Sequence, residues 1–172
     1  MRECGMLLPV ASLPSRYGIG AFSKEAYDFI DTLKAAGQSF WQILPLGPTG
    51  FGDSPYQSFS AFAGNPYFID LDMLIEEGLL TKEFVDSKRW NIEDQYVDYG
   101  LVYNSRFEVL RVAYENSNHK ELDEYKEFFT ENEFWLEDYS LYRACKDKYE
   151  GRPWSEWDKK IKFREGETVG AF

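Results

Sequence analysis

The first part of the chain places an amphipathic stretch between two apolar stretches, and this order restricts the possible folds more than any other feature. Residues 6–10 and 40–44 predict short buried strands. Between them apolar residues recur at helical spacing, with Ser23 as the predicted N-cap and Gly37 as the predicted C-cap. A strand, a helix and a strand in this order form a βαβ unit, in which the two strands are parallel.

Two parallel strands do not make a complete sheet. Parallel sheets are usually buried on both faces and contain several strands. The pattern therefore predicts an α/β protein of which this chain is the first, truncated portion. The further strands are expected from residues beyond Phe172.

Beyond residue 70 the pattern becomes mostly helical. Asp70 precedes a short helical stretch and Thr81 precedes another, so each is a candidate N-cap. From Tyr99 onward, bulky residues recur at helical spacing and predict buried helix faces. The predicted faces are Tyr99, Val102, Tyr103, Phe107, Leu110 and Tyr114; Leu122, Tyr125, Phe128 and Phe129; and Trp135, Tyr139, Tyr142 and Cys145. The sequence thus predicts two parts, residues 1–70 and residues 71–172.

Composition excludes several classes of function. The formal net charge of -11 argues against nucleic-acid partners and against anionic membrane surfaces. His119 is the only histidine, so a histidine triad and a multi-histidine metal site are excluded within this chain. Cys4 and Cys145 make no disulfide framework, and no stretch resembles a signal peptide or a membrane span. We expect a cytoplasmic protein without a metal or cofactor.

Residues 44–66, called the long loop below, follow the second predicted strand. This segment is rich in glycine, proline, hydroxyl and aromatic residues, and loops of such length are usually functional or disordered. Disorder is not expected, because its aromatic rings would leave much apolar area in water. Aromatic rings can stack on the apolar faces of sugars, while hydroxyls and backbone groups bind the polar edges. The long loop therefore predicts a surface for a polyhydroxylated ligand.

Three carboxylates admit two interpretations each. Asp53 could orient a ligand hydroxyl, but an aspartate before Ser54 and Pro55 more often fixes a turn. Asp70 and Asp72 could form a glycosidase carboxylate pair. Helix capping by Asp70, with Asp72 in the first turn, is the favoured interpretation.

Two further motifs are weighed in the same way. Gly18, Ile19 and Gly20 form half of a dinucleotide-binding pattern, and a plain loop turn is favoured. Trp154 and Trp157 could stack on a ligand, and burial against a neighbouring helix is favoured.

Residues 13–20, 36–50 and 52–66 resemble the start of 4-α-glucanotransferases of the amylomaltase (disproportionating enzyme) family. The resemblance implies a (β/α)8 TIM barrel, of which the two predicted strands are the first two. The helical part is then a subdomain inserted after the second strand. The long loop would lie at the C-terminal end of that strand, where barrel enzymes build their sites.

The resemblance also implies a function. The family transfers α-1,4-glucan segments between maltooligosaccharides with retention, which needs a carboxylate nucleophile and a carboxylic acid/base. In the family these groups lie on later barrel strands, beyond this chain, so no catalytic residue is assigned here. By motif position, Tyr56 resembles a tyrosine that packs against the sugar near the cleavage point, and Ser54 a residue that contacts the glucan beside it. Phe51 stands where a glucan-binding tyrosine is common, and Pro9 where many members have histidine.

The leading hypothesis is an N-terminal fragment of a 4-α-glucanotransferase that is inactive by itself, because the remainder of the barrel is missing. The alternative is a non-catalytic glucan-binding module that retains the long loop. A third option is an acidic helical interaction module built from residues 99–149.

Overall fold

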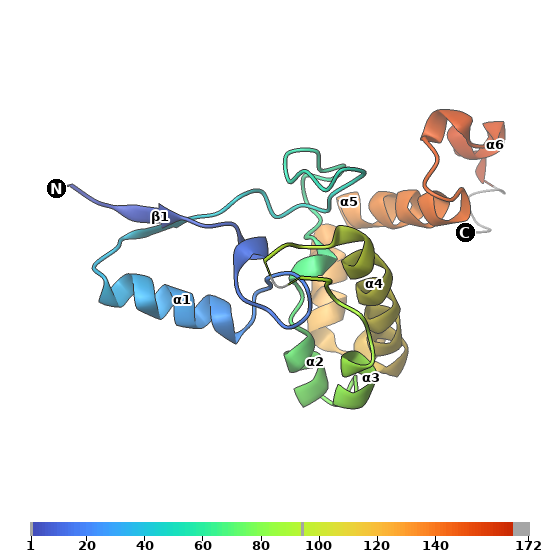
Figure 1. Ribbon diagram of the computed structural model, residues 1–172. Helices are drawn as coiled ribbons and strands as arrows, with labels where there is room; N and C mark the ends of the chain where they lie inside the picture. The colour runs from blue at the N-terminus through green and yellow to red at the C-terminus, as the bar shows by residue number, and fades with distance from the viewer. Residues whose placement is uncertain (1, 94, 167–172) are drawn as a thin grey trace. The chain divides into compact units, whose positions relative to one another are not determined.

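The computed structural model describes residues 2–93 and 95–166 (Figure 1). By its internal contacts the chain divides into two compact units, Met1–Ser117 and Asn118–Phe172. The boundary expected after residue 70 falls inside the first of these units. Among the described helices, none is long and apolar enough to cross a membrane.

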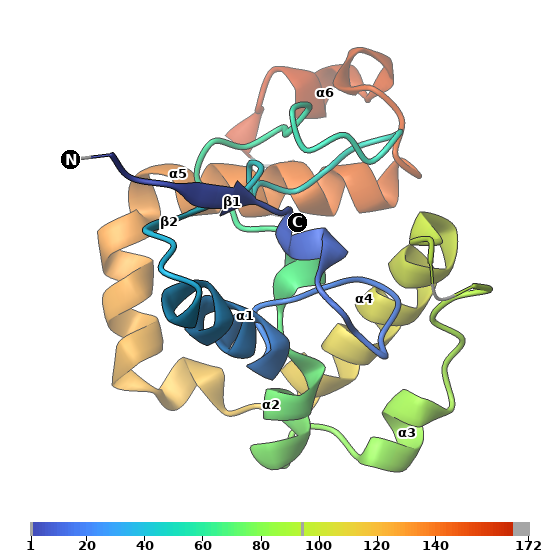
Figure 2. The same cartoon turned by 60° about the vertical axis from the view of Figure 1, so that its left-hand side comes forward.

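The predicted βαβ unit opens the first unit. Strand β1 (Gly5–Leu7), helix α1 (Lys24–Ala35) and strand β2 (Phe40–Gln42) follow one another, and a 3-10 helix, η1 (Val10–Ser12), comes after β1. The strands pair in parallel with Met6 opposite Trp41, which confirms the predicted topology. Each strand has 3 residues and is shorter than predicted. Figure 2 shows α1 running beside this ribbon.

Helix α1 begins directly after the predicted N-cap, Ser23, and its C-cap is Ala36, one residue before the predicted Gly37. Ser23 is the N-cap by position, but its hydroxyl donates to the Glu25 carboxylate rather than capping a backbone group. At the other end Gly37 has a φ of 71°. The amide of Gly37 donates to the Lys34 carbonyl, and the amide of Gln38 donates to the Leu33 carbonyl. These two bonds are the Schellman ending that a glycine with positive φ permits.

The prediction that both strands are buried is wrong for the described residues. Met6, Leu7 and Phe40 are 48%, 55% and 58% exposed. Helix α1 packs against the ribbon through the rings of Phe29 and Trp41, whose centroids are 5.1 Å apart. A ribbon of two strands with one helix against it leaves the other face and the outer edges in solvent.

A 3-10 helix, η2 (Pro66–Phe68), begins at the last residue of the long loop. Asn65 caps it, because its side-chain oxygen accepts the amide hydrogen of Tyr67 at 3.0 Å. Proline at the first position has the φ that a helical turn requires. An asparagine–proline pair therefore produces the helical turn at the end of the long loop.

Three helices complete the first unit: α2 (Leu71–Glu76), α3 (Lys82–Asp86) and α4 (Tyr99–Asn116). The capping interpretation of Asp70 is confirmed, since its carboxylate accepts the amide hydrogen of Asp72 at 3.0 Å. Thr81 caps α3 in the same way through the amide of Phe84 at 3.3 Å. The helices enclose an apolar core whose buried members are Tyr17, Leu71, Leu80, Val85, Trp90, Val109 and Ala113.

The face of α4 that is buried differs from the predicted aromatic face. Tyr103 and Tyr114 are 49% and 56% exposed, so these rings lie outside the core. Val102 is buried as predicted. The other buried positions of α4 carry small or β-branched side chains and one arginine: Ser105, Arg106, Val109 and Ala113. Small side chains allow helices to approach closely, whereas large rings can remain in part at the edge of a contact.

The second unit contains η3 (His119–Glu121), α5 (Asp123–Lys148), η4 (Trp154–Glu156) and α6 (Lys159–Lys162). Among the described residues of α5, only Cys145 is buried. The prediction that the aromatic side chains of this helix are buried is therefore wrong. Cys145 forms a small core with Trp157 and Ile161. Trp157 is 7% exposed, as the burial interpretation predicted, but Trp154 is 62% exposed and contradicts it.

Candidate functional site

The long loop is closed at its base by contacts between its own ends. The amide of Asn65 donates to the carbonyl of Leu46 at 2.8 Å, so the entry and exit of the loop lie side by side. Gly47 lies against Ser58, because a Cβ at Gly47 would meet the Ser58 hydroxyl oxygen at 2.3 Å. The Ser58 hydroxyl donates to the Ser60 carbonyl at 2.7 Å. Hydrogen bonds and close packing thus define the path of this irregular segment.

A strained turn forms the tip of the loop. Gly52 and Asp53 both have positive φ, 88° and 51°. The amide of Asp53 donates to the Gly50 carbonyl at 3.1 Å, and its carboxylate accepts the Thr49 hydroxyl at 3.4 Å. These bonds confirm the turn interpretation of Asp53, since aspartate is one of the few residues other than glycine that adopts this conformation readily.

The three predicted sugar-contact residues lie on this turn and just beyond it. Phe51 is 105% exposed and Tyr56 is 73% exposed, so both rings are open to solvent. Ser54 is half-buried, and its carbonyl accepts the amide hydrogen of Gln57 at 3.1 Å. An anchored loop that exposes large rings is suited to stacking against a flat, partly apolar ligand.

A cavity of about 170 Å³ lies beneath the loop. Its lining comes from the segments that follow β1 and β2, from the loop and from α4, and includes Asp53, Tyr67 and Tyr99. Burial raises the pKa of the Asp53 carboxyl. Burial also raises the pKa of both phenols, and the negative charge of Asp53 raises them further. The tyrosines are therefore neutral at pH 7, and their hydroxyl protons remain available for hydrogen bonding.

Arg106 of α4 is a further polar group near Tyr67 in the first unit. Its side chain is 0% exposed, and its Nη2 donates to the carbonyl of Tyr67. Burial lowers the pKa of Arg106 to about 10, while the charge of Asp70 acts in the opposite direction. The guanidinium therefore remains protonated at pH 7.

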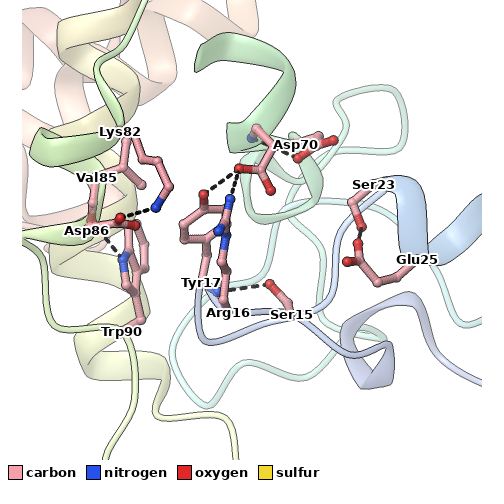
Figure 3. Close-up of polar contacts among 11 residues, drawn as sticks. Ser15, Arg16, Tyr17, Ser23, Glu25, Asp70, Lys82, Val85, Asp86 and Trp90 are labelled. Atoms are coloured by element: carbon pink, nitrogen blue, oxygen red, sulfur yellow. Dashed lines mark hydrogen bonds and ion pairs between the residues drawn. The ribbon is translucent and has the colours of Figure 1, made fainter. Parts of the chain in front are cut away.

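The loop after η1 is tied to the start of α2. The carboxylate of Asp72 accepts hydrogen bonds from Arg16 and from the Tyr17 hydroxyl, the latter at 2.6 Å. Figure 3 shows the side chains of Arg16 and Tyr17 pointing toward the start of α2, where Asp70 lies. Because the Asp70 carboxylate caps α2 and the Asp72 carboxylate binds these donors, each has a structural role. Neither residue is needed as half of a glycosidase pair.

The glycines of this segment have packing roles. A Cβ at Gly18 would meet the Trp90 carbonyl oxygen at 2.3 Å, and one at Gly20 would meet the Val10 carbonyl oxygen at 2.1 Å. Gly18 also has a φ of 78°. Close backbone approach explains both glycines and supports the plain-turn interpretation over dinucleotide binding. Over residues 2–93 and 95–166, no three His, Cys, Asp or Glu side chains group in a way that could hold a metal ion.

The residues predicted for this region do not include four that the structure places there: Thr49, Tyr67, Tyr99 and Arg106. Arg106 carried a usable signal, because it stands between Val102 and Val109 at helical spacing on the buried stripe of α4. A lone cation on an apolar stripe indicates a buried polar contact.

Comparison with known proteins decides the family. The family model described as 4-alpha-glucanotransferase matches residues 8–172. The chain belongs to the 4-alpha-glucanotransferase family. It is 50% identical over 160 residues to the 4-alpha-glucanotransferase of Clostridium butyricum, covering 93% of this chain and 33% of that protein. It is 46% identical over 172 residues to the Thermus thermophilus enzyme, covering 98% of this chain and 33% of that protein.

A solved structure agrees with this assignment. The amylomaltase from Streptococcus agalactiae, in complex with acarbose, matches with a TM-score of 0.90 and 39% sequence identity. The match covers 99% of this chain and 35% of that one. The chain therefore spans about a third of the length of the relatives that it matches. The resemblance found in the sequence is confirmed at the level of the family.

Proposed function

We propose that the protein acts in 4-α-glucanotransfer, as the part of the enzyme that carries the first two strands of a (β/α)8 barrel and the glucan-contacting loop. Residues 71–172, with helices α2 to α6, then belong to a subdomain inserted after the second strand. The family match over residues 8–172 supports the activity. The parallel pair β1–β2, with the long loop directly after β2, supports the barrel, because barrel enzymes build their sites at the carboxyl ends of strands.

The observation that carries the proposal is the exposed, anchored tip of the long loop. Tyr56 is proposed to pack against the sugar near the cleavage point, and Ser54 to contact the glucan beside it. Phe51 is proposed to stack on glucan farther away, without the hydrogen bond that a tyrosine would add. The 105% exposure of Phe51 and the 73% exposure of Tyr56 support these roles. The acarbose complex of the Streptococcus agalactiae amylomaltase supports a maltooligosaccharide-like ligand.

The chemistry is proposed to proceed with retention, by a nucleophile and an acid/base that lie outside these 172 residues. The chain by itself is then expected to release no glucose from maltotriose. A chimera tests this directly: residues 8–172 replace the matching segment of the Clostridium butyricum enzyme. We expect glucose release from maltotriose by the chimera and none by the 172-residue chain. Turnover by the chain alone, or an inactive but folded chimera, would contradict the proposal.

Glucan binding without catalysis is the second candidate. This candidate is favoured because the first unit alone forms the base of the loop. Both the hydrogen bond between Asn65 and Leu46 and the cavity under the loop lie within that unit. The 172-residue chain could then bind glucan alone. A change in Trp or Tyr fluorescence on adding maltoheptaose, lost in Tyr56→Ala, would support this candidate.

The cytoplasm is the proposed compartment. It is supported by Cys4 and Cys145, which are both free thiols. Fractionation of cells that express the tagged protein is expected to place it with soluble cytoplasmic markers.

A further inference from the structure

Arg106 occupies a position that favours apolar side chains. Val102 and Val109, on the same stripe of α4, are 0% exposed, and so is Arg106. Removing a guanidinium from water costs free energy unless its N–H groups find acceptors. Among the described residues, the Nε and Nη1 atoms of Arg106 are buried without a hydrogen-bond partner. An aliphatic side chain would avoid this cost, so the arginine needs an explanation other than core packing.

Among residues 2–93 and 95–166, the side chain of Arg106 makes one hydrogen bond, and it reaches the residue that follows the long loop. Its Nη2 donates to the carbonyl of Tyr67 in η2. Asn65, which precedes η2, closes the loop through its bond to Leu46 and caps η2 through its bond to the Tyr67 amide. The guanidinium therefore holds a carbonyl group two residues beyond Asn65, whose amide joins the two ends of the loop.

The surroundings of Arg106 keep the guanidinium in this place. Its carbon Cζ lies 5.8 Å from the centre of the Trp90 ring, within the range of a cation–π contact. The negative charge of Asp70, the N-cap of α2, also favours the charged guanidinium. The ring of Trp90, before α4, and the charge of Asp70, at the start of α2, thus both favour one charged group beside the end of the loop.

We propose that Arg106 is a positioning residue for the glucan-contacting loop. By holding the Tyr67 carbonyl it fixes η2 and, through Asn65 and Leu46, the two ends from which the loop emerges. The consequence for glucan transfer rests on the proposed function, whereas the consequence for the order of the loop does not. In this way a helix outside the βαβ unit controls where Ser54 and Tyr56 stand.

The first test is amide hydrogen exchange of the 172-residue protein and of its Arg106→Met variant. Loss of a hydrogen bond from a charged donor is expected to speed exchange in residues 44–68 by about tenfold or more. Val109→Ala is the matched control: Val109 is equally buried in α4, but its core includes Leu71, Val85 and Trp90 instead of η2. We expect the control to speed exchange around residues 71–90 and to leave the loop within about twofold of wild type. Equal acceleration of the loop by both variants would overturn the proposal.

A conservative variant keeps the test decisive if Arg106→Met does not fold. Arg106→Lys retains a charge and donors on a flexible stem, but it lacks the fork of the guanidinium. We expect the loop of this variant to exchange at a rate between those of wild type and Arg106→Met. If Arg106→Met is unfolded, the comparison is made between Arg106→Lys and Val109→Ala. Loop exchange in Arg106→Lys that is unchanged from wild type then contradicts the proposal.

The second test uses the chimera with the Clostridium butyricum enzyme. At a temperature where both variants are folded, Arg106→Met is expected to lower kcat/KM for maltotriose by about tenfold, mainly by raising KM. Val109→Ala is expected to leave both constants unchanged. An inactive but folded parent chimera would refute the proposed function and not the positioning role, which the exchange experiment decides by itself. Wild-type kinetics in the Arg106→Met chimera would overturn the proposed consequence of Arg106 for glucan transfer.

Discussion

The long loop and helix α5 differ in two properties, the regularity of the backbone and its burial against the rest of the protein. The loop is irregular but anchored, whereas α5 is regular but has little buried surface. Residues 43–65 between β2 and η2 form no helix or strand, yet Ala63 and Asn65 are buried and the base of the loop is joined by hydrogen bonds. Helix α5 is a continuous helix of 26 residues, yet Cys145 is its one buried residue. Regular structure and tertiary anchoring are therefore separate properties in this chain.

The difference has a physical origin. A helix satisfies its own backbone groups wherever it lies, so α5 needs no neighbour to complete its hydrogen bonds. An irregular loop must find partners for its backbone elsewhere, and the long loop uses Ser58, Ser60 and Asn65 for this purpose. Substitutions in the loop should therefore affect a shaped site, whereas substitutions on the exposed parts of α5 should do little.

The largest expected effect is that of Tyr56→Ala on glucan transfer. Stacking against a sugar would remove roughly 80 Å² of the exposed ring from water, which is worth about 2 kcal/mol. In the chimera we expect kcat/KM for maltotriose to fall by about 30-fold, with the folded state unchanged. The control is Tyr114→Ala on α4, which removes a ring of similar exposure, 56%, far along the chain from the loop. A loss of activity as large in the control would remove the distinction between the loop and the helices.

A substitution at Gly47 tests whether the loop is as closely packed as its contacts indicate. Gly47→Ala would place a methyl group 2.3 Å from the Ser58 hydroxyl oxygen and 2.9 Å from its Cβ. Overpacking of this kind typically costs about 1–3 kcal/mol, and relief here requires breaking the bond from Ser58 to Ser60. We expect a lower urea midpoint and weaker glucan transfer.

The double variant Gly47→Ala with Ser58→Gly supplies the control, because it removes the two Ser58 atoms that lie nearest the new methyl group and leaves the Ser60 carbonyl oxygen at 3.3 Å. We expect it to recover part of the lost stability, although the glycine adds flexibility. A Gly47→Ala protein with wild-type stability would show that the loop is looser than the base contacts imply.

The sequence predicted the order of elements better than it predicted burial. The βαβ unit, the caps Asp70 and Thr81, and the turn at Asp53 follow from local signals: apolar periodicity, capping side chains and turn residues. Strand burial and the buried face of α4 depend on which other elements lie against them, and local signals do not contain this information.

The candidate site was predictable only in part for the same reason. Phe51, Ser54 and Tyr56 stand in one motif, so their resemblance to a family pattern could be seen in the sequence. Arg106 lies 39 residues from Tyr67 in sequence, and their hydrogen bond exists only after α4 has packed. A contact between distant segments leaves no local pattern beyond an arginine on an apolar stripe.

A pH-dependent effect is expected at Asp53, whose pKa is raised by burial. A raised pKa in the folded state means that the protonated carboxyl is favoured by folding. Its contribution to stability is present below the ordinary pKa of aspartate and is lost as the pH rises through the raised value. Asp53→Asn mimics the protonated form and tolerates the positive φ. We expect Asp53→Asn to be more stable than wild type at pH 7, with the difference shrinking as the pH falls toward 4.

Urea unfolding of wild type and of Asp53→Asn at several pH values measures the difference in their free energies of unfolding. The other carboxyl groups are the same in both proteins, so their contributions cancel. Asp86→Asn is the control, because Asp86 lies on the exposed surface of α3 and pairs with Lys82 across one helical turn. Its difference from wild type should have the opposite sign at pH 7, since the substitution removes a favourable ion pair. A gap between Asp53→Asn and wild type that does not change with pH would mean that the Asp53 carboxylate is not held in a buried setting.

The smallest effect is expected on α5, and it tests the other half of the comparison. Phe128 is 49% exposed, and a Phe128→Ser substitution removes a ring that contributes little to the core. We expect the free energy of unfolding to change by less than about 0.5 kcal/mol, the usual range for surface positions. Cys145→Ser in the same helix, at a position 1% exposed, should cost more, because it places a hydroxyl in an apolar core. If Phe128→Ser destabilises the protein as much as Cys145→Ser does, then α5 is anchored as firmly as the long loop, and regularity and anchoring are not separate in this chain.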